Sequence, residues 1–156
     1  MSAWAGWPKI KALLTKAGLD MNTPIRQIGQ GVPRSVPTDM IRYWYEGIVE
    51  YPFAAGQPPT ITHEGLRVTV GVFLRMGGDM SPESEAATDW RLEDAERAVR
   101  KALWGDVALN ADGTATATGL EIGSSTSDIQ TVQGAWVRFV EIPLTYGVVD
   151  RHSIAQ

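Results

Sequence analysis

The sequence predicts an α+β fold, a single mostly antiparallel β-sheet with a long β-hairpin and two helices packed on one face. Residues 41–51 and 60–76 alternate apolar and polar side chains with the period of two that marks a β-strand. Residues 7–17 and 82–103 carry apolar stripes with helical spacing. The chain has 156 residues and no internal repeat, so one domain is expected over residues 1–156.

The first predicted element is a helix from about Trp4 to Ala17. Its apolar stripe consists of Trp7, Ile10, Leu14 and Ala17. Pro8 suits only a first helical turn, where its missing N–H costs nothing, so the regular helix is expected to start near Trp7. Gly18 is predicted to end the helix as a left-handed cap.

Residues 20–39 follow as a long irregular segment. Prolines and glycines interrupt this segment, and it shows no apolar periodicity. A connection of this length inside one domain is uncommon and is often functional. Two interpretations stay open, a meandering surface connection and a second cover for the sheet.

The opening strand of the predicted hairpin reads IRYWYEGIVEY. One face is expected to carry Ile41, Tyr43, Tyr45, Val49 and Tyr51, and the other Arg42, Trp44, Glu46, Ile48 and Glu50. Tyr43 and Tyr45 are assigned to the face under the helices, and Gly47 is a candidate bulge. The partner strand places Leu66, Val68, Val70, Val72, Leu74 and Met76 on one face and Arg67, Thr69, Gly71, Phe73 and Arg75 on the other.

The second helix is predicted from a Ser81 cap to about Leu103, with Gly105 ending it. Its buried stripe consists of Leu92, Ala95, Val99, Ala102 and Leu103. Glutamate and arginine four residues apart are expected to support the helix, as the pairs Glu93–Arg97 and Glu96–Arg100.

The last third of the chain predicts a short strand near 115–122, a polar loop at 123–133 and a final strand over 135–149. The final strand carries apolar residues on both faces, which indicates that both faces are covered. Pro143 cannot donate to a ladder and predicts an edge or a bulge at its position.

Composition and motifs do not point to catalysis. The chain has no cysteine, and neither His63 nor His152 has the spacing of a metal site. Nucleophile elbows, phosphate-binding loops and dinucleotide fingerprints do not occur in the sequence. No catalytic, cofactor-binding or metal-ligating residue is predicted, and an enzyme is not expected. No apolar run approaches the length of a membrane span, so no membrane partner is expected.

The aromatic strip at 41–51 could be core, a stacking platform for bases or a protein-binding surface. A net charge of −4, with Glu46 and Glu50 inside the strip, argues against nucleic-acid readout, which needs a basic surface. Trp44 and Phe73 fall on the face away from the helices, and aromatic and arginine side chains are favoured at protein interfaces. The predicted subunit interface consists of Arg42, Trp44, Arg67, Phe73 and Arg75.

The element order and the stretches LRVTVGVFLRM, LEDAERAVRKALWG and WVRFVEIPLTYGVVDR resemble the tail terminator proteins of long-tailed bacteriophages. The resemblance covers residues 41–150 in order and is one of pattern, since that family has no signature motif. It implies a homo-oligomeric ring of six subunits that caps the tail tube protein, stops its polymerisation and joins it to the head-tail connector or stopper protein. It also implies a virion protein of the tail or neck, made in the host cytoplasm, with no cofactor and with DNA passing through the channel without sequence-specific binding.

Under that resemblance, the loops at 22–38 and 123–133 are expected to contact the tube or the neck, with Arg26, Arg34 and Asp128 as candidate contact residues. An acidic subunit suits a channel that DNA crosses without sticking. One alternative in the same setting is a head-completion or stopper protein of the neck, or a tube subunit, which the strong central helix disfavours. The other, from a different class, is a small soluble enzyme or ligand-binding domain with a pocket under residues 20–39.

Overall fold

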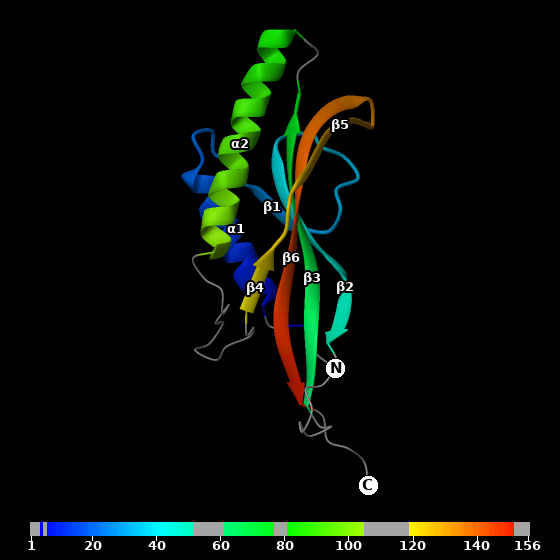
Figure 1. The fold of residues 1–156 in the computed structure, drawn as a ribbon. Helices are drawn as coiled ribbons and strands as arrows, with labels where there is room; N and C mark the ends of the chain where they lie inside the picture. Colours follow the sequence, from blue (N-terminus) through cyan, green and yellow to red (C-terminus); the bar gives the residue numbers. More distant parts are fainter. Residues whose placement is uncertain (1–3, 5, 52–60, 77–80, 105–118, 152–156) are drawn as a thin grey trace.

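A computed structural model describes residues 4, 6–51, 61–76, 81–104 and 119–151, without the side chains of residues 50, 51, 61–63 and 148–151. Two helices cover one face of a twisted sheet (Figure 1). The elements in order are α1 Trp7–Asp20, β1 Gln27–Gln30, β2 Met40–Tyr51, β3 Ile61–Arg75, α2 Pro82–Trp104, β4 Gly119–Ile122, β5 Thr126–Val132 and β6 Ala135–Arg151.

The sheet has six strands in the order β1-β2-β3-β6-β4, with β5 also paired to β6. β1 runs parallel to β2, and the other pairings are antiparallel. The predicted α+β class and the long hairpin of β2 and β3 are confirmed. The connection predicted between these two strands lies outside the described residues.

The bulge predicted at Gly47 is confirmed, because the β2–β3 register shifts between Tyr45 and Gly47. Gly47 has a φ of 133°, which glycine adopts without strain. The extra residue changes the side-chain phase, so Ile48 lies opposite Leu66 and joins the helix face. The predicted assignment of Ile48 to the outer face and of Val49 to the helix face was therefore wrong.

The main core lies between the helices and the sheet. The apolar stripes of both helices pack there, with Trp7 and Ala102 only partly buried, together with the predicted inner face of β3 and Tyr43 of β2. Tyr45 was predicted to be buried but is 54 % exposed. Its neighbours in the same row, Val68 of β3 and Leu144 of β6, are each 1 % exposed, so at this level the cover reaches the inner strands but not β2.

Gly18 does not cap α1, because the helix continues to Asp20 and its C-cap is Met21. The glycine instead permits a close backbone approach. A Cβ at this position would lie 2.1 Å from the carbonyl oxygen of Ile25, whose N–H donates to the Gly18 carbonyl at 3.0 Å. Gly18 therefore fixes the path by which the chain leaves α1.

The predicted start and surface pairs of α2 are confirmed. Ser81 Oγ accepts the N–H of Ser84 at 3.2 Å. The i,i+4 pairs Glu93–Arg97 and Glu96–Arg100 have N–O distances of 2.8 and 2.9 Å. The predicted end at Gly105 lies outside the described residues, and α2 is described to Trp104.

The loop predicted at 123–133 was wrong over most of its length, because it contains β5. A two-residue turn joins β5 to β6, with Gln133 at φ 48° and Gly134 at φ 80°. Both positive angles match the type I′ turn favoured in hairpins. The described part of the strand predicted near 115–122 is β4.

Pro143 lies where β6 passes from β5 to β4. β5 pairs with β6 up to Glu141, and β4 pairs with β6 from Leu144 onward. The Pro143 carbonyl accepts the N–H of Gly123 at 2.9 Å on this side. The proline therefore interrupts the ladder on the side where β6 changes partners, in agreement with the predicted local edge.

Residues 20–39 were predicted to be irregular. This prediction was wrong for Gln27–Gln30, which form strand β1. Part of this segment covers the outer face of the sheet, where Val36, Met40, Phe73 and Val137 form a second buried cluster. Asp39 holds the segment in place by accepting the N–H of Arg75 at 2.9 Å and by pairing with Arg91 of α2. The interpretation of the segment as a second cover is therefore correct for this end of the sheet.

A candidate assembly surface on the sheet

Among the described residues, the distal part of β2 forms a sheet edge that no other strand pairs with. β1 pairs only with Met40–Tyr43, and the last link is a 2.9 Å hydrogen bond from the Gly31 N–H to the Tyr43 carbonyl. From Trp44 to Tyr51, the outer edge of β2 has no strand partner among the described residues. A long free edge presents unpaired N–H and C=O groups and is a template for pairing with another chain.

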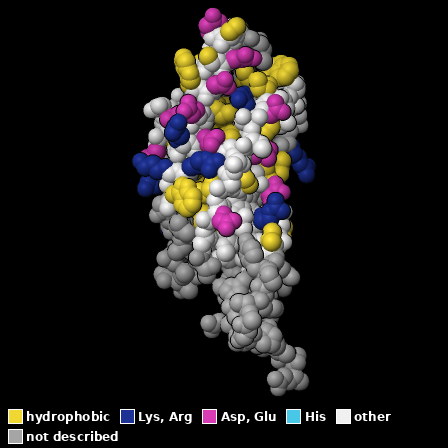
Figure 2. Space-filling model, in the orientation of Figure 1, with side chains coloured by type: hydrophobic (Ala, Val, Ile, Leu, Met, Phe, Trp, Pro, Cys, Tyr) yellow, Lys and Arg dark blue, Asp and Glu magenta, His cyan; other side chains and the backbone are white. Residues whose placement is uncertain are grey.

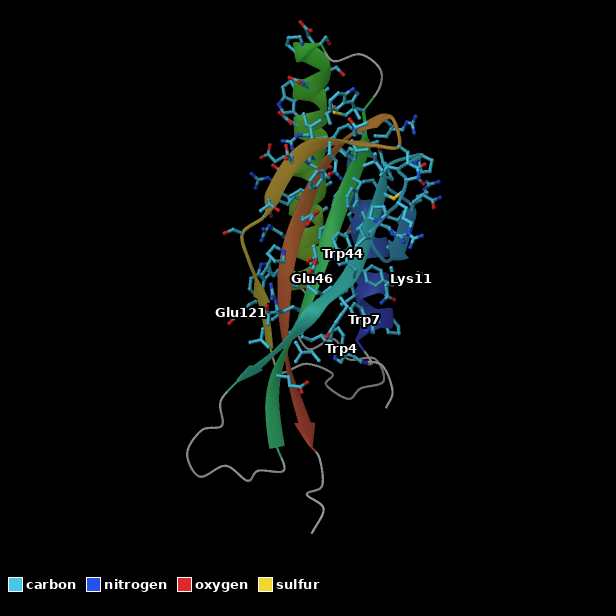
Figure 3. All side chains as sticks on the ribbon, turned by 90° about the vertical axis from the view of Figure 1, so that its right-hand side faces the viewer. Trp4, Trp7, Lys11, Trp44, Glu46 and Glu121 are labelled. Carbon is cyan, nitrogen blue, oxygen red and sulfur yellow. The ribbon has the colours of Figure 1, made fainter. Side chains whose placement is uncertain are left out.

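Apolar side chains flank this edge. Tyr45 and Ile48 lie on the helix face and are 54 % and 50 % exposed, while Val49 on the outer face is 39 % exposed. Trp4 contacts Tyr146 at a ring-centroid distance of 5.0 Å, and Trp7 contacts Tyr43 at 6.1 Å (Figure 3). The aromatic cover of the helix face therefore stops beside Tyr45 and Ile48.

Sequence reasoning missed Tyr45 and Ile48 as surface residues, although the element lengths held a signal. A strand of 12 residues spans about 40 Å, whereas a helix of 14 residues spans about 21 Å. One helix of this length cannot cover the whole of such a strand. The excess of strand length indicates that part of β2 lies outside the helical cover, although it does not identify which residues.

The five residues predicted at a subunit interface all lie on the outer face of the sheet, as the strand register shows. Two of them hold local structure. Arg42 donates to the carbonyls of Gly31 at 2.8 Å and Gln30 at 2.7 Å, which fixes the turn after β1. Arg75 donates to the Val36 carbonyl at 3.1 Å and secures the covering segment.

Phe73 is 3 % exposed, so within one chain it is a core residue and leaves almost no surface for a partner. This corrects its assignment to the interface. Its ring contacts Phe139 at 5.9 Å and Trp44 at 6.3 Å. Gly71 lies beneath these rings, and a Cβ there would approach Phe73 to 2.5 Å and Trp44 to 3.1 Å.

Trp44 and Glu46 lie beside one another on β2 (Figure 3). The Glu46 carboxylate accepts Trp44 Nε1 at 2.6 Å and Thr69 Oγ1 at 3.0 Å. Burial, followed by the negative charge of Glu46, raises the pKa of the Glu141 carboxyl on the same face. This part of the outer face therefore pairs polar groups with one another and disfavours additional negative charge.

Arg67, the last of the five predicted interface residues, is an exposed side chain of the outer face and lies opposite Gly47.

The residues predicted to contact the tube or neck do not gather in one site. Arg26 and Arg34 are exposed on either side of β1, whereas Asp128 lies on β5, where its carboxylate accepts the Ile129 N–H at 2.8 Å.

The ligand-binding alternative has a candidate pocket of about 300 Å³ between residues 21–25 and α2. Trp90 at its rim is 71 % exposed. The Asp94 carboxylate accepts the backbone N–H of Asn22 at 2.9 Å and its side-chain amide at 3.2 Å. Asp94 thus serves to fasten the chain after α1 to α2.

The charges on the face seen in Figure 2 are mixed, with lysine and arginine interspersed among aspartate and glutamate. Among the described residues, no three His, Cys, Asp or Glu side chains are grouped closely enough to hold a metal ion. Within the same residues, no helix combines the length and the apolar character needed to cross a membrane. The side chains of His63 and His152 lie outside the described residues.

Comparison with known proteins gives no match, either among protein-family models or among curated protein sequences.

Proposed function

We propose that the chain is a structural subunit of a bacteriophage virion, a tail terminator that forms a ring, six-membered by the resemblance. The ring caps the tail tube, stops its polymerisation and joins it to the head-side connector or stopper protein. Its action is associative and has no turnover. DNA passes through the channel without being read.

The free distal edge of β2, with Tyr45 and Ile48 exposed beside it, is the observation that carries this proposal. Its backbone groups, which pair with no strand among the described residues, and its apolar flanks favour association with another protein chain. A second support is the resemblance of element order, strands and central helix to the tail terminators.

A heterologous ring needs two different complementary surfaces on each subunit. The sheet offers two ends that differ in sequence, one formed by β1 and the distal part of β2, and the other by β4 and β5. This asymmetry supports a closed ring of identical subunits better than it supports a two-fold dimer, which would use one surface twice.

Deleting the gene from a phage that carries it tests the proposal. Negative-stain electron microscopy of the lysate is expected to show tail tubes longer than in the parent phage and separate from heads. Supplying the wild-type chain in trans should restore the parental tube length. Tails of parental length beside leaking, DNA-filled heads would assign the protein to the head side of the neck, as a completion or stopper protein.

A further inference from the structure

We propose that neighbouring copies join by strand pairing, with β4 of one copy running antiparallel along the distal edge of β2 of the next. This inference rests on the proposed ring and identifies the subunit contact that would build it. It assigns one occupant, a second copy of the chain, to the free edge described above.

Strand direction is the first argument. β2, β3, β6 and β4 are neighbours in that order and are successively antiparallel, so β4 runs opposite to β2. A rotation about an axis roughly along the strands leaves strand directions unchanged. Copies related in this way bring β4 and the next β2 together as an antiparallel pair, which is the more stable arrangement.

The side-chain rows across the sheet are the second argument. On the helix face, one row is formed by Tyr45, Val68, Leu144 and Ile122, and the next by Ile48, Leu66, Tyr146 and Leu120. Each row begins with an exposed apolar residue on β2 and ends with an apolar residue on β4. Pairing β4 with the next β2 would continue both rows and cover the exposed side chains of Tyr45 and Ile48.

The bulge at Gly47 gives the apolar side chains of the β2 edge the same spacing as those of the β4 edge. Tyr45 and Ile48 are three positions apart in sequence, yet they face Val68 and Leu66, which are two apart. Their spacing along the edge therefore equals that of Ile122 and Leu120 on β4, where the strand is regular. Without the bulge, only one of the two β2 side chains would face the helix side.

Trp104 supplies the third argument. This side chain is 54 % exposed at the end of α2. Arg100, one turn earlier, donates to the Gly123 carbonyl at 2.9 Å, which places that face of α2 over the end of β4. An apolar ring thus flanks β4 on the side of the sheet where Tyr45 and Ile48 flank β2.

Engineered disulfides test this contact, since the natural chain has no cysteine. Two double variants test two registers of the contact. Tyr45→Cys with Ile122→Cys tests the register that continues the rows directly. Ile48→Cys with Ile122→Cys tests a register shifted by two residues. After oxidation, at least one is expected to give a ladder of covalent multimers on a non-reducing gel, because facing Cβ atoms in antiparallel strands approach to about 4.5–5.5 Å. Each single variant should stay monomeric on the gel.

The control variant moves one of the two cysteines to the opposite face of the sheet. In Tyr45→Cys with Glu121→Cys, the two positions lie on opposite faces, so at least tenfold less cross-linked product is expected. Equal cross-linking of this control would overturn the pairing. Rings seen by electron microscopy and light scattering, with neither test variant cross-linked, would overturn the contact and leave the ring standing. A wild-type chain that stays monomeric, with no ladder in any variant, would overturn both.

Discussion

Gly18 illustrates how one residue can reverse the usual effect of a substitution. Replacing a glycine inside a helix by alanine ordinarily stabilises a protein by about 0.5–1 kcal/mol. Here the added methyl group would lie 2.1 Å from the carbonyl oxygen of Ile25, which is backbone and cannot rotate away. The steric cost outweighs the gain in helix propensity.

Gly18→Ala is therefore expected to lower the free energy of unfolding by about 1–3 kcal/mol, the usual range for overpacking. Urea denaturation followed by circular dichroism measures it. Ala12→Gly, at an exposed position of the same helix, is the comparison and should cost about 1 kcal/mol. A Gly18→Ala protein as stable as the wild type would contradict the close approach to Ile25.

Glu141, on the outer face of the sheet, is expected to make the stability of the protein depend on pH. Its raised pKa means that the folded chain binds a proton there more tightly than the unfolded chain does, so its contribution to stability falls as pH rises through the interval between the two pKa values. Glu141→Gln removes this loss. The variant is therefore expected to melt at a higher temperature than the wild type at pH 7, and the difference between the two proteins is expected to be smaller at pH 4. Melting temperatures measured between pH 4 and pH 7 test this effect. The same pH dependence in both proteins would contradict it.

At the scale of elements, periodicity predicted β3 and both helices well, because each is long and buries one regular face. β1 and β5 were missed for a physical reason. β1 has four residues, and the side chains of β5 are mostly polar and exposed, so neither carries a hydrophobic period. Pairing with β2 and β6 determines their structure, and the sequence of each strand contains little sign of its neighbour.

The β5–β6 turn gives a prediction for these strands. Gly134 has a φ of 80°, so Gly134→Ala is expected to destabilise the hairpin by about 1–2 kcal/mol. Faster hydrogen exchange at the β5 amides would report the loss. Gly119→Ala is the matched change, since its Cβ would meet nothing within 4 Å and its φ is not positive. Similar exchange in both variants would exclude the turn as the cause.

At the scale of the whole molecule, the candidate site was predicted in part. A period of two was enough to place Arg42, Trp44 and Arg67 on one face. It could not show that Phe73 is covered, because the cover comes from Val36, distant in sequence and without a pattern of its own. Nor could it show that Tyr45 is exposed, because that depends on which strands of the sheet the helices cover.

The exposed edge leads to a prediction for assembly. Ile48→Glu is expected to weaken self-association about tenfold or more, since a contact that buries an unpaired carboxylate loses roughly 1–3 kcal/mol. Sedimentation velocity over a concentration series measures the change. Leu19→Glu introduces the same charge at a 57 % exposed leucine of α1 and should associate like the wild type. Equal weakening by both variants would show an effect of net charge alone.

The central position of β6 has a consequence for synthesis on the ribosome. β6 is the last strand in chain order, yet it pairs with β3, β4 and β5. Until residues 137–151 have left the ribosome, β3 lacks its second neighbour and the sheet is divided. The nascent chain therefore completes its core late, through contacts between distant residues that form slowly. Because β4 joins the sheet only through β6, the β4 end of the sheet, which the proposed contact requires, appears only after β6 has formed.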